Sequence, residues 1–334
     1  MRRVRHCARA LDPLVARLLP VCQDLTSARN ELRWIKERAE PNRLRHLVNR
    51  RACGEPLQYV LGTTYFGPLE LQCRPGVLIP RQDTATWVSY LAHSVPSPPG
   101  DRLHLLDLCT GSGCIPLLFH HEFYSIPRNS QSALCLTALD VSHDALELTR
   151  KNCQIQFSSL ASAPNRQFLQ HMHIAQANVL DQSSVLKALE KIDRHAKVDI
   201  LTCNPPYIAP KDFESLDRSV KNFEPKSALV PCHEPLHTAR PLLDSKVDVD
   251  GDTFYPILFK LASRLRVKTV CLEVGDTEQA MRVASFAAKD WDSVKVIRDD
   301  PDHAQTTLLQ LEGGKVLFVG RGHGRAVVAS TQKQ

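Results

Sequence analysis

The chain has 334 residues, of which 43 % are apolar, and it carries a formal net charge of +6. This length suggests two domains, or one large domain with an extension, and the apolar content is enough for a packed core. No apolar run approaches the length of a membrane span, so we expect no membrane segment. The basic excess is small and spread out, and by itself it does not indicate a nucleic-acid partner.

The eleven cysteines form no CxxC pair, and no Cys/His cluster has the spacing of a zinc site. We therefore expect no metal. Several cysteines lie inside apolar runs, Cys109, Cys203 and Cys271 among them. This placement is typical of buried free thiols in a reducing compartment.

The N-terminal part is predicted to be helical. From about residue 11 to residue 51 apolar residues recur with the helical period. Pro20 and Pro41 interrupt the pattern, so we predict several short helices in a small domain over residues 1–53. Residues 54–83 change character, since Leu57–Gly62 and Val77–Ile79 suggest short strands between Gly and Pro turns. This segment is predicted to be a linker hairpin.

Strands and helices alternate in the rest of the chain, residues 84–334. A helix over 84–94 comes first, and polar stretches near 122–133 and 155–168 are predicted to be inserted loops. Alternation of this kind predicts an α/β fold with a mostly parallel, doubly wound sheet. The predicted strands are Leu103–Cys109, Leu134–Asp140, Met172–Gln176, Val198–Cys203, Val267–Glu273, Val294–Ile297 and Ala326–Ala329.

A glycine-rich turn follows the first of these strands. In Asp107–Gly113, glycines let the backbone approach a ligand, and the next helix offers free N–H groups. A dinucleotide fingerprint needs a third glycine where Pro116 stands, which weakens that interpretation. An acid followed by Gly-x-Gly suits the amino acid portion of S-adenosylmethionine instead. We assign Asp107, Thr110, Gly111 and Gly113 to this methyl donor.

Asp140 ends the next strand. An acid at this place can accept hydrogen bonds from both ribose hydroxyls of a bound nucleoside, although it can also serve as a helix N-cap. The glycine-rich turn one strand earlier favours the ribose role.

Asn204-Pro205-Pro206-Tyr207 follows the strand that ends at Cys203. The two prolines remove two N–H donors, so the Pro205 carbonyl and the Asn204 side chain can act as two acceptors for a planar –NH2 group. Holding those hydrogens localises the nitrogen lone pair toward the donor methyl group. We expect Asn204, Pro205 and Tyr207 to be catalytic and all four residues to bind the acceptor, with Tyr207 stacked on it. Asn204 is also expected to bind the methyl donor. The alternative is an ordinary Pro-rich turn.

These motifs leave the acceptor open between an amide and an exocyclic base amine. A nucleic-acid adenine-N6 or cytosine-N4 methyltransferase uses the same chemistry after base flipping. Only 6 % of the chain is aromatic, which does not favour a base-stacking platform. A catalytically silent S-adenosylmethionine-binding assembly factor is a further alternative, but it has no need of intact acceptors.

The chain resembles the PrmC/HemK family, the N5-glutamine methyltransferases of peptide chain release factors. The resemblance runs from the helical N-terminus nearly to the end. The matching segments are Gly54–Gly62, Pro75–Arg81, Asp107–Gly113, Asn204–Ile208, Phe223–Leu229, Leu272–Gly275 and Gly322–Val328.

The resemblance implies a class I S-adenosylmethionine methyltransferase with a seven-stranded sheet, one strand antiparallel. It implies that Asn204 and Pro205 bind the Gln amide of a release factor's Gly-Gly-Gln loop, and that residues 1–53 recognise this partner. We expect a monomer with no nucleic-acid substrate. Asn178 is expected to bind the donor near its adenine. Two features depart from the family: an Asp is usual at the position of Asn178, and the segment 300–322 is longer than expected.

The predicted location combines two observations. Arg2, Arg3, Arg5 and Arg9 precede the first acid, which resembles a mitochondrial transit peptide, although a basic first helical turn explains them equally well. The resemblance adds that bacterial and mitochondrial members carry the helical N-terminal domain. We therefore predict a mitochondrial enzyme, with the cytoplasm as the alternative.

Overall fold

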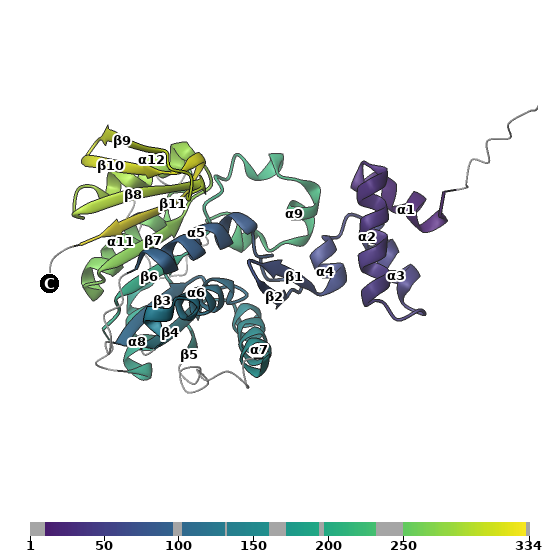
Figure 1. Cartoon of the computed structure of the whole chain (residues 1–334), viewed down its shortest axis with the longest axis horizontal. Coiled ribbons are helices and arrows are strands. Elements are labelled where there is room, and N and C mark those ends of the chain that lie inside the picture. Colours follow the sequence, from purple (N-terminus) through teal and green to yellow (C-terminus); the bar gives the residue numbers. More distant parts are fainter. Residues whose placement is uncertain are drawn as a thin grey trace, which may run out of the picture.

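A computed structural model describes residues 11–95, 102–130, 132–159, 172–193, 197–231 and 250–331. Its N-terminal part is a cluster of short helices, which Figure 1 shows to one side of the sheet. They are α1 (Pro13–Cys22), α2 (Leu25–Arg38) and α3 (Leu44–Ala52). Their facing sides bury Leu18, Ile35 and Val48 completely. The Arg-rich start lies outside the described residues.

Short helices were predicted here, but Pro20 does not separate two of them, because it lies inside α1. The helix ends two residues later, where Gln23 takes a left-handed φ of 64°. Asp24 then caps α2 by accepting a hydrogen bond from the Ser27 amide, which begins a new helix.

The linker contains a hairpin, as predicted, but its first segment was misassigned. Leu57–Leu61 forms the helix α4, and not a strand. Gly62 ends it with a φ of 78°, and the antiparallel strands β1 (Thr63–Phe66) and β2 (Leu69–Gln72) follow. The predicted strand Val77–Ile79 is also wrong, because this segment runs without a regular partner strand. It passes instead along the cavity described below.

The main sheet has nine strands in the order β5-β4-β3-β6-β7-β11-β8-β10-β9. Strands β5, β4, β3, β6 and β7 are parallel, whereas β11 runs antiparallel to both of its neighbours, β7 and β8. The bounds are β3 (Arg102–Leu108), β4 (Ala133–Asp140), β5 (Met172–Gln176), β6 (Ile200–Cys203), β7 (Thr269–Glu273), β8 (Ser293–Asp300), β9 (Thr306–Leu311), β10 (Gly314–Val319) and β11 (Arg321–Ser330).

Seven of these strands form the predicted doubly wound sheet with one antiparallel member. The two additional strands are β9 and β10, a hairpin whose second strand pairs parallel with β8. The hairpin accounts for the unexpected length of the segment 300–322. The predicted fold class is confirmed, and the sheet is two strands wider than expected.

Helices cover both faces of this sheet (Figure 1). Helices α5 (Gln82–Ser94) and α6 (Cys114–Ser125) pack on one face, where Trp87 and Phe119 are almost completely buried. On the other face lie α8 (Gln182–Ile192), α11 (Phe254–Leu265) and α12 (Thr277–Ala287). The remaining helix of the doubly wound unit is α7 (His143–Ser159), and a short helix α9 (Arg218–Phe223) follows β6.

The predicted loops near 122–133 and 155–168 are only partly loops. Helix α6 continues to Ser125 and a 3-10 turn covers Pro127–Asn129, while α7 continues to Ser159. Residues 160–171 lie outside the described part. Among the described residues, no helix combines the length and apolarity needed to cross a membrane.

Candidate active site

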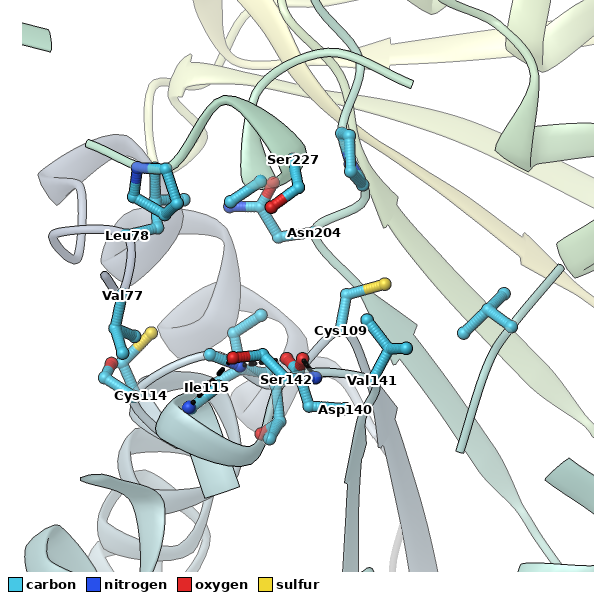
Figure 2. Close-up of a pocket in the computed structure, with 18 of the residues that line it drawn as sticks. Val77, Leu78, Cys109, Cys114, Ile115, Asp140, Val141, Ser142, Asn204 and Ser227 are labelled. Carbon is cyan, nitrogen blue, oxygen red and sulfur yellow. Dashed lines mark hydrogen bonds between the residues drawn. The ribbon is translucent and has the colours of Figure 1, made fainter. Parts of the chain in front are cut away.

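A cavity of about 310 Å³ opens at the carboxyl ends of β3, β4 and β6. The turns after these three strands line it, and Figure 2 shows Asp140, Ser142 and Ile115 on the side opposite Asn204 and Ser227. Other segments that line it are residues 76–81 after the hairpin, residues 177–180 after β5, and Pro225, Ser227 and Ala228 after α9. Ligands of open α/β sheets bind at this edge of the sheet.

The glycine-rich turn forms the floor of the cavity. Gly111 has a φ of +58° and open space where a Cβ would stand, so a ligand can approach its backbone. Gly113 has a φ of +78°, and a Cβ there would lie 2.8 Å from the Thr149 side chain. Packing against α7 thus requires a glycine at position 113. Gly113 was assigned to the methyl donor from the sequence, but it is not among the residues that line the cavity.

Unpaired polar atoms lie along this turn. Asp107 Oδ2, Thr110 Oγ1 and Ser112 Oγ are buried and make no hydrogen bond of good geometry among the described residues, although the Thr110 hydroxyl lies near enough to Asp107 to lower the pKa of its carboxyl group. A buried polar atom without a partner costs about 1–3 kcal/mol, so these three atoms indicate a place built for a polar ligand. The hydroxyls of Thr110 and Ser112 belong to residues that line the cavity.

Asp107 lies beneath the floor and not on the cavity surface. Its side chain is fully buried, and Thr202 Oγ1 donates to Asp107 Oδ1 over 2.7 Å. Burial raises the pKa of Asp107 to about 7, because no cation compensates the carboxylate there. The amine of a bound amino acid would supply that cation. The donor chemistry therefore fits the residues present.

Asp140 lines the cavity at the end of β4, as predicted. Its two carboxylate oxygens accept hydrogen bonds from the Gly111 amide at 2.9 Å and the Ser142 amide at 2.8 Å. Each oxygen keeps a second lone pair, so both can still accept a ribose hydroxyl. Burial raises the pKa of Asp140. Asn178 also lines the cavity, and its Oδ1 accepts a hydrogen bond from the Leu180 amide at 3.0 Å.

The four residues after β6 divide into two pairs. Asn204 and Pro206 line the cavity, whereas Pro205 is buried and lies outside the lining. Tyr207 also lies outside it: its ring packs against Gly275, and its hydroxyl donates to Glu273 over 3.4 Å. The ring therefore faces the turn after β7, and the predicted stacking of Tyr207 on the acceptor finds no support in this geometry.

The residue that the sequence interpretation missed is Glu224. The sequence alone gives this acid no role, but its side chain is only 1 % exposed. Its carboxylate accepts hydrogen bonds from the Ile79 amide at 3.0 Å and from Arg81 Nη2 at 2.6 Å. The signal was available, because both matching segments, Pro75–Arg81 and Phe223–Leu229, belong to the family resemblance. The contact between the two segments, in contrast, could not be inferred from the sequence.

The strand order, the antiparallel strand β11 between β7 and β8, and the turns after β3, β4 and β6 define a class I S-adenosylmethionine-dependent methyltransferase. The groups that would bind the methyl donor come from two turns, because the glycine-rich turn after β3 and Asp140 after β4 line the same cavity.

Comparisons with known proteins agree. The chain is 34 % identical over 233 residues to the mitochondrial MRF1 N(5)-glutamine methyltransferase of Saccharomyces cerevisiae, covering 68 % of this chain and 66 % of that one. It is 32 % identical to the probable mitochondrial counterpart of Schizosaccharomyces pombe, covering 66 % and 69 %. The release factor glutamine methyltransferase of Haemophilus influenzae is 29 % identical, covering 80 % and 79 %.

The chain thus belongs to the release factor glutamine methyltransferase family. It spans about two thirds of the length of the two yeast relatives. A scan against protein-family models gives no match. Among solved structures, the N-terminal domain of human METTL16 matches with a TM-score of 0.47 and 14 % identity, covering 100 % of this chain and 98 % of that one.

Proposed function

We propose that this enzyme transfers the methyl group of S-adenosylmethionine to the side-chain amide nitrogen of the glutamine in a release factor's Gly-Gly-Gln motif. The names of the relatives support this substrate, because they describe methyltransferases that act on a glutamine of a release factor or of MRF1. The observation that carries the proposal is the place of Asn204, on the cavity wall opposite the donor-side residues Asp140 and Ser142 (Figure 2).

The residues of the cavity suit an amide acceptor. A glutamine nitrogen is a poor nucleophile because its lone pair is delocalised into the carbonyl group. The Asn204 oxygen can accept one amide hydrogen, and the Pro205 carbonyl is proposed to accept the other. Hydrogen bonds fixed in this way favour the geometry in which the lone pair points at an electrophilic carbon.

On the donor side, Asp107, Thr110, Gly111 and Asp140 would hold S-adenosylmethionine, with Asn178 near its base. The bound donor supplies a methyl group activated by a sulfonium. Asp107 would favour the donor's ammonium group, directly or through water, and Asp140 would orient the ribose. Asn204 borders both ligands and would set the distance between them.

The direct test is incubation with isotopically labelled S-adenosylmethionine and a mitochondrial release factor, followed by mapping of the label by mass spectrometry. We expect label on the glutamine of Gly-Gly-Gln. The same factor with this glutamine changed to glutamate is the matched control and should stay unlabelled. Label on an adenine of co-purified RNA, or none on the glutamine, would overturn the proposal.

The organisation and location belong to the same proposal. Residues 1–53 would form the substrate-recognition domain, 54–83 the linker and 84–334 the methyltransferase domain of a monomer. The two yeast relatives are named as mitochondrial enzymes, which supports a mitochondrial location. Fractionation of cells that express the full chain, with import-dependent protease protection as the readout, tests this point against a cytoplasmic location.

A further inference from the structure

Tyr207 is held in place at both ends. Its hydroxyl donates to Glu273 Oε1 over 3.4 Å, and its ring lies so close to Gly275 that a Cβ there would come within 3.2 Å of two ring carbons. Its carbonyl oxygen accepts a hydrogen bond from Gln279 Nε2 at 3.1 Å. Tyr207 is the last residue of the turn Asn204–Tyr207, which we call the acceptor turn. Contacts with the end of β7, the turn that follows it and α12 thus hold Tyr207 in place.

Gln279 is itself fully engaged. Its side chain is buried, its Oε1 accepts from the Gly275 amide at 2.8 Å, and its Nε2 also donates to Asp252 Oδ1 at 2.9 Å. A glutamine with these three partners has one orientation available. The Tyr207 backbone therefore cannot shift without breaking a buried network.

Glu273 connects this network to a second helix. Its other oxygen, Oε2, accepts a hydrogen bond from Trp87 Nε1 of α5 at 2.8 Å. Within the described residues the carboxylate makes no ion pair. The charged groups nearby are Asp83 of α5 and, 3.3 Å from Asp83, Arg325 of β11, while Tyr255 of α11 donates to the Glu273 backbone carbonyl.

We propose that Glu273 is a positioning residue for methyl transfer: it holds Tyr207 against the sheet so that Asn204, three residues earlier on the same turn, faces the cavity. This inference rests on the proposed function. It also reassigns Tyr207, which anchors the acceptor turn through its hydroxyl instead of stacking on the acceptor.

The proposal gives the reaction a particular pH dependence. An ionised carboxylate accepts from Trp87 and Tyr207 at once, whereas a protonated one must give up an acceptor site to its own proton. Burial raises the pKa of Glu273 to about 7, and the negative charge of Asp83 raises it further. Turnover should therefore fall as the pH drops through about 7.

The test compares kcat against pH for wild type, Glu273→Gln, Tyr207→Phe and the double variant. We expect each single variant to lose about tenfold in kcat, the size expected for a hydrogen bond to a charged group. Both should lack the acid limb near pH 7. The double variant should be no slower than either single variant, because both remove the same contact. Affinity for the donor, measured by calorimetry, should stay unchanged.

Two results would overturn the inference: a Tyr207→Phe enzyme with the wild-type rate and acid limb, or losses that simply add in the double variant. Tyr207→Phe removes one oxygen and keeps the ring packing, so it carries the test even if Glu273→Gln does not fold. Failure of the proposed function looks different, because the wild type then leaves the release factor glutamine unlabelled. In that case the same pH profiles apply to the acceptor found.

Discussion

Arg81 and Glu224 form an ion pair of 2.6 Å between segments that are 143 residues apart in the chain. Arg81 follows the linker hairpin, and Glu224 follows α9. The residues next to this pair, 76–80 on one side and Pro225, Ser227 and Ala228 on the other, line the same cavity. One buried carboxylate therefore ties together two walls of the proposed donor site.

Breaking this pair from either side should have unequal effects. Arg81→Met leaves the buried Glu224 carboxylate without its cation, whereas Glu224→Gln keeps an oxygen for the Ile79 amide and removes the charge. We expect Arg81→Met to cost about 2 kcal/mol of unfolding free energy, less than for a fully buried pair because the Arg81 side chain is 35 % exposed. Glu224→Gln should cost about half as much. Urea unfolding measures both, and equal losses would contradict the burial argument.

The sequence predicted the alternation of the sheet well, because buried parallel strands appear as short apolar runs with turns between them. It failed where local and tertiary preferences differ. Leu57–Leu61 has the apolar residues of a strand, but it forms a short helix that ends at Gly62. The buried Val60 of this helix packs in the core of the N-terminal helices, and the buried Tyr59 packs against Cys73 and Ile79. The β9–β10 hairpin alternates too weakly in polarity to be recognised.

The candidate site shows the same division. Asp140 and Asn204 end predicted strands, so strand order alone brings them to one cavity. Glu224 and Glu273 depend on contacts with residues 143 and 186 positions away, which no local pattern contains. The orientation of Tyr207 likewise follows from Gly275 and not from its own motif.

Asn204→Ala should lower turnover about a hundredfold or more, because one of two proposed acceptors for the amide hydrogens is lost. Donor affinity should remain nearly intact. Single-turnover kinetics with a saturating release factor separate these effects. Unchanged turnover would remove Asn204 from the catalytic role.

Asp107→Asn should make donor binding independent of pH near neutrality. The folded wild-type carboxyl, with its pKa raised to about 7, must lose its proton to hold the donor's ammonium group. Wild-type affinity should therefore fall as the pH drops below about 7, while the weaker affinity of the variant stays flat. Calorimetry in two buffers of different ionisation enthalpy detects the released proton, and no proton release in the wild type would refute this role.

The stability of the donor-free protein should have the opposite pH trend. Burial gives Asp107 and Glu273 pKa values of about 7 in the folded chain, above the ordinary values of 3.8 and 4.5 for these carboxyl groups. The folded state then binds more protons than the unfolded state between these values, so stability is highest at the acid end of this window. It is lost as the pH rises through about 7. Glu273→Gln should flatten the curve, as measured by denaturant midpoints from pH 5 to 8.

Gly251 and Gly62 offer a matched comparison of backbone and space. Their φ angles are +80° and +78°, but a Cβ at Gly251 would lie 2.2 Å from the Tyr207 carbonyl oxygen, while Gly62 has nothing within 4 Å. Gly62→Ala should cost only the left-handed backbone, roughly 1–2 kcal/mol. Gly251→Ala should cost more and also slow methyl transfer, since it displaces Tyr207. Equal decreases in the melting temperature of the two variants would contradict this prediction, because they would show that the turn Asn204–Tyr207 moves aside at little cost.

The position of β11 between β7 and β8 has a consequence for biosynthesis. This strand comes last among the described strands, yet its hydrogen bonds close the gap between two strands made earlier. A nascent chain that has not reached residues 321–330 exposes two open edges in the middle of its future sheet, and unpaired edges recruit other chains. The sheet can therefore become continuous only after residues 321–330 have left the ribosome, and a chaperone that shields strand edges would protect the chain until then.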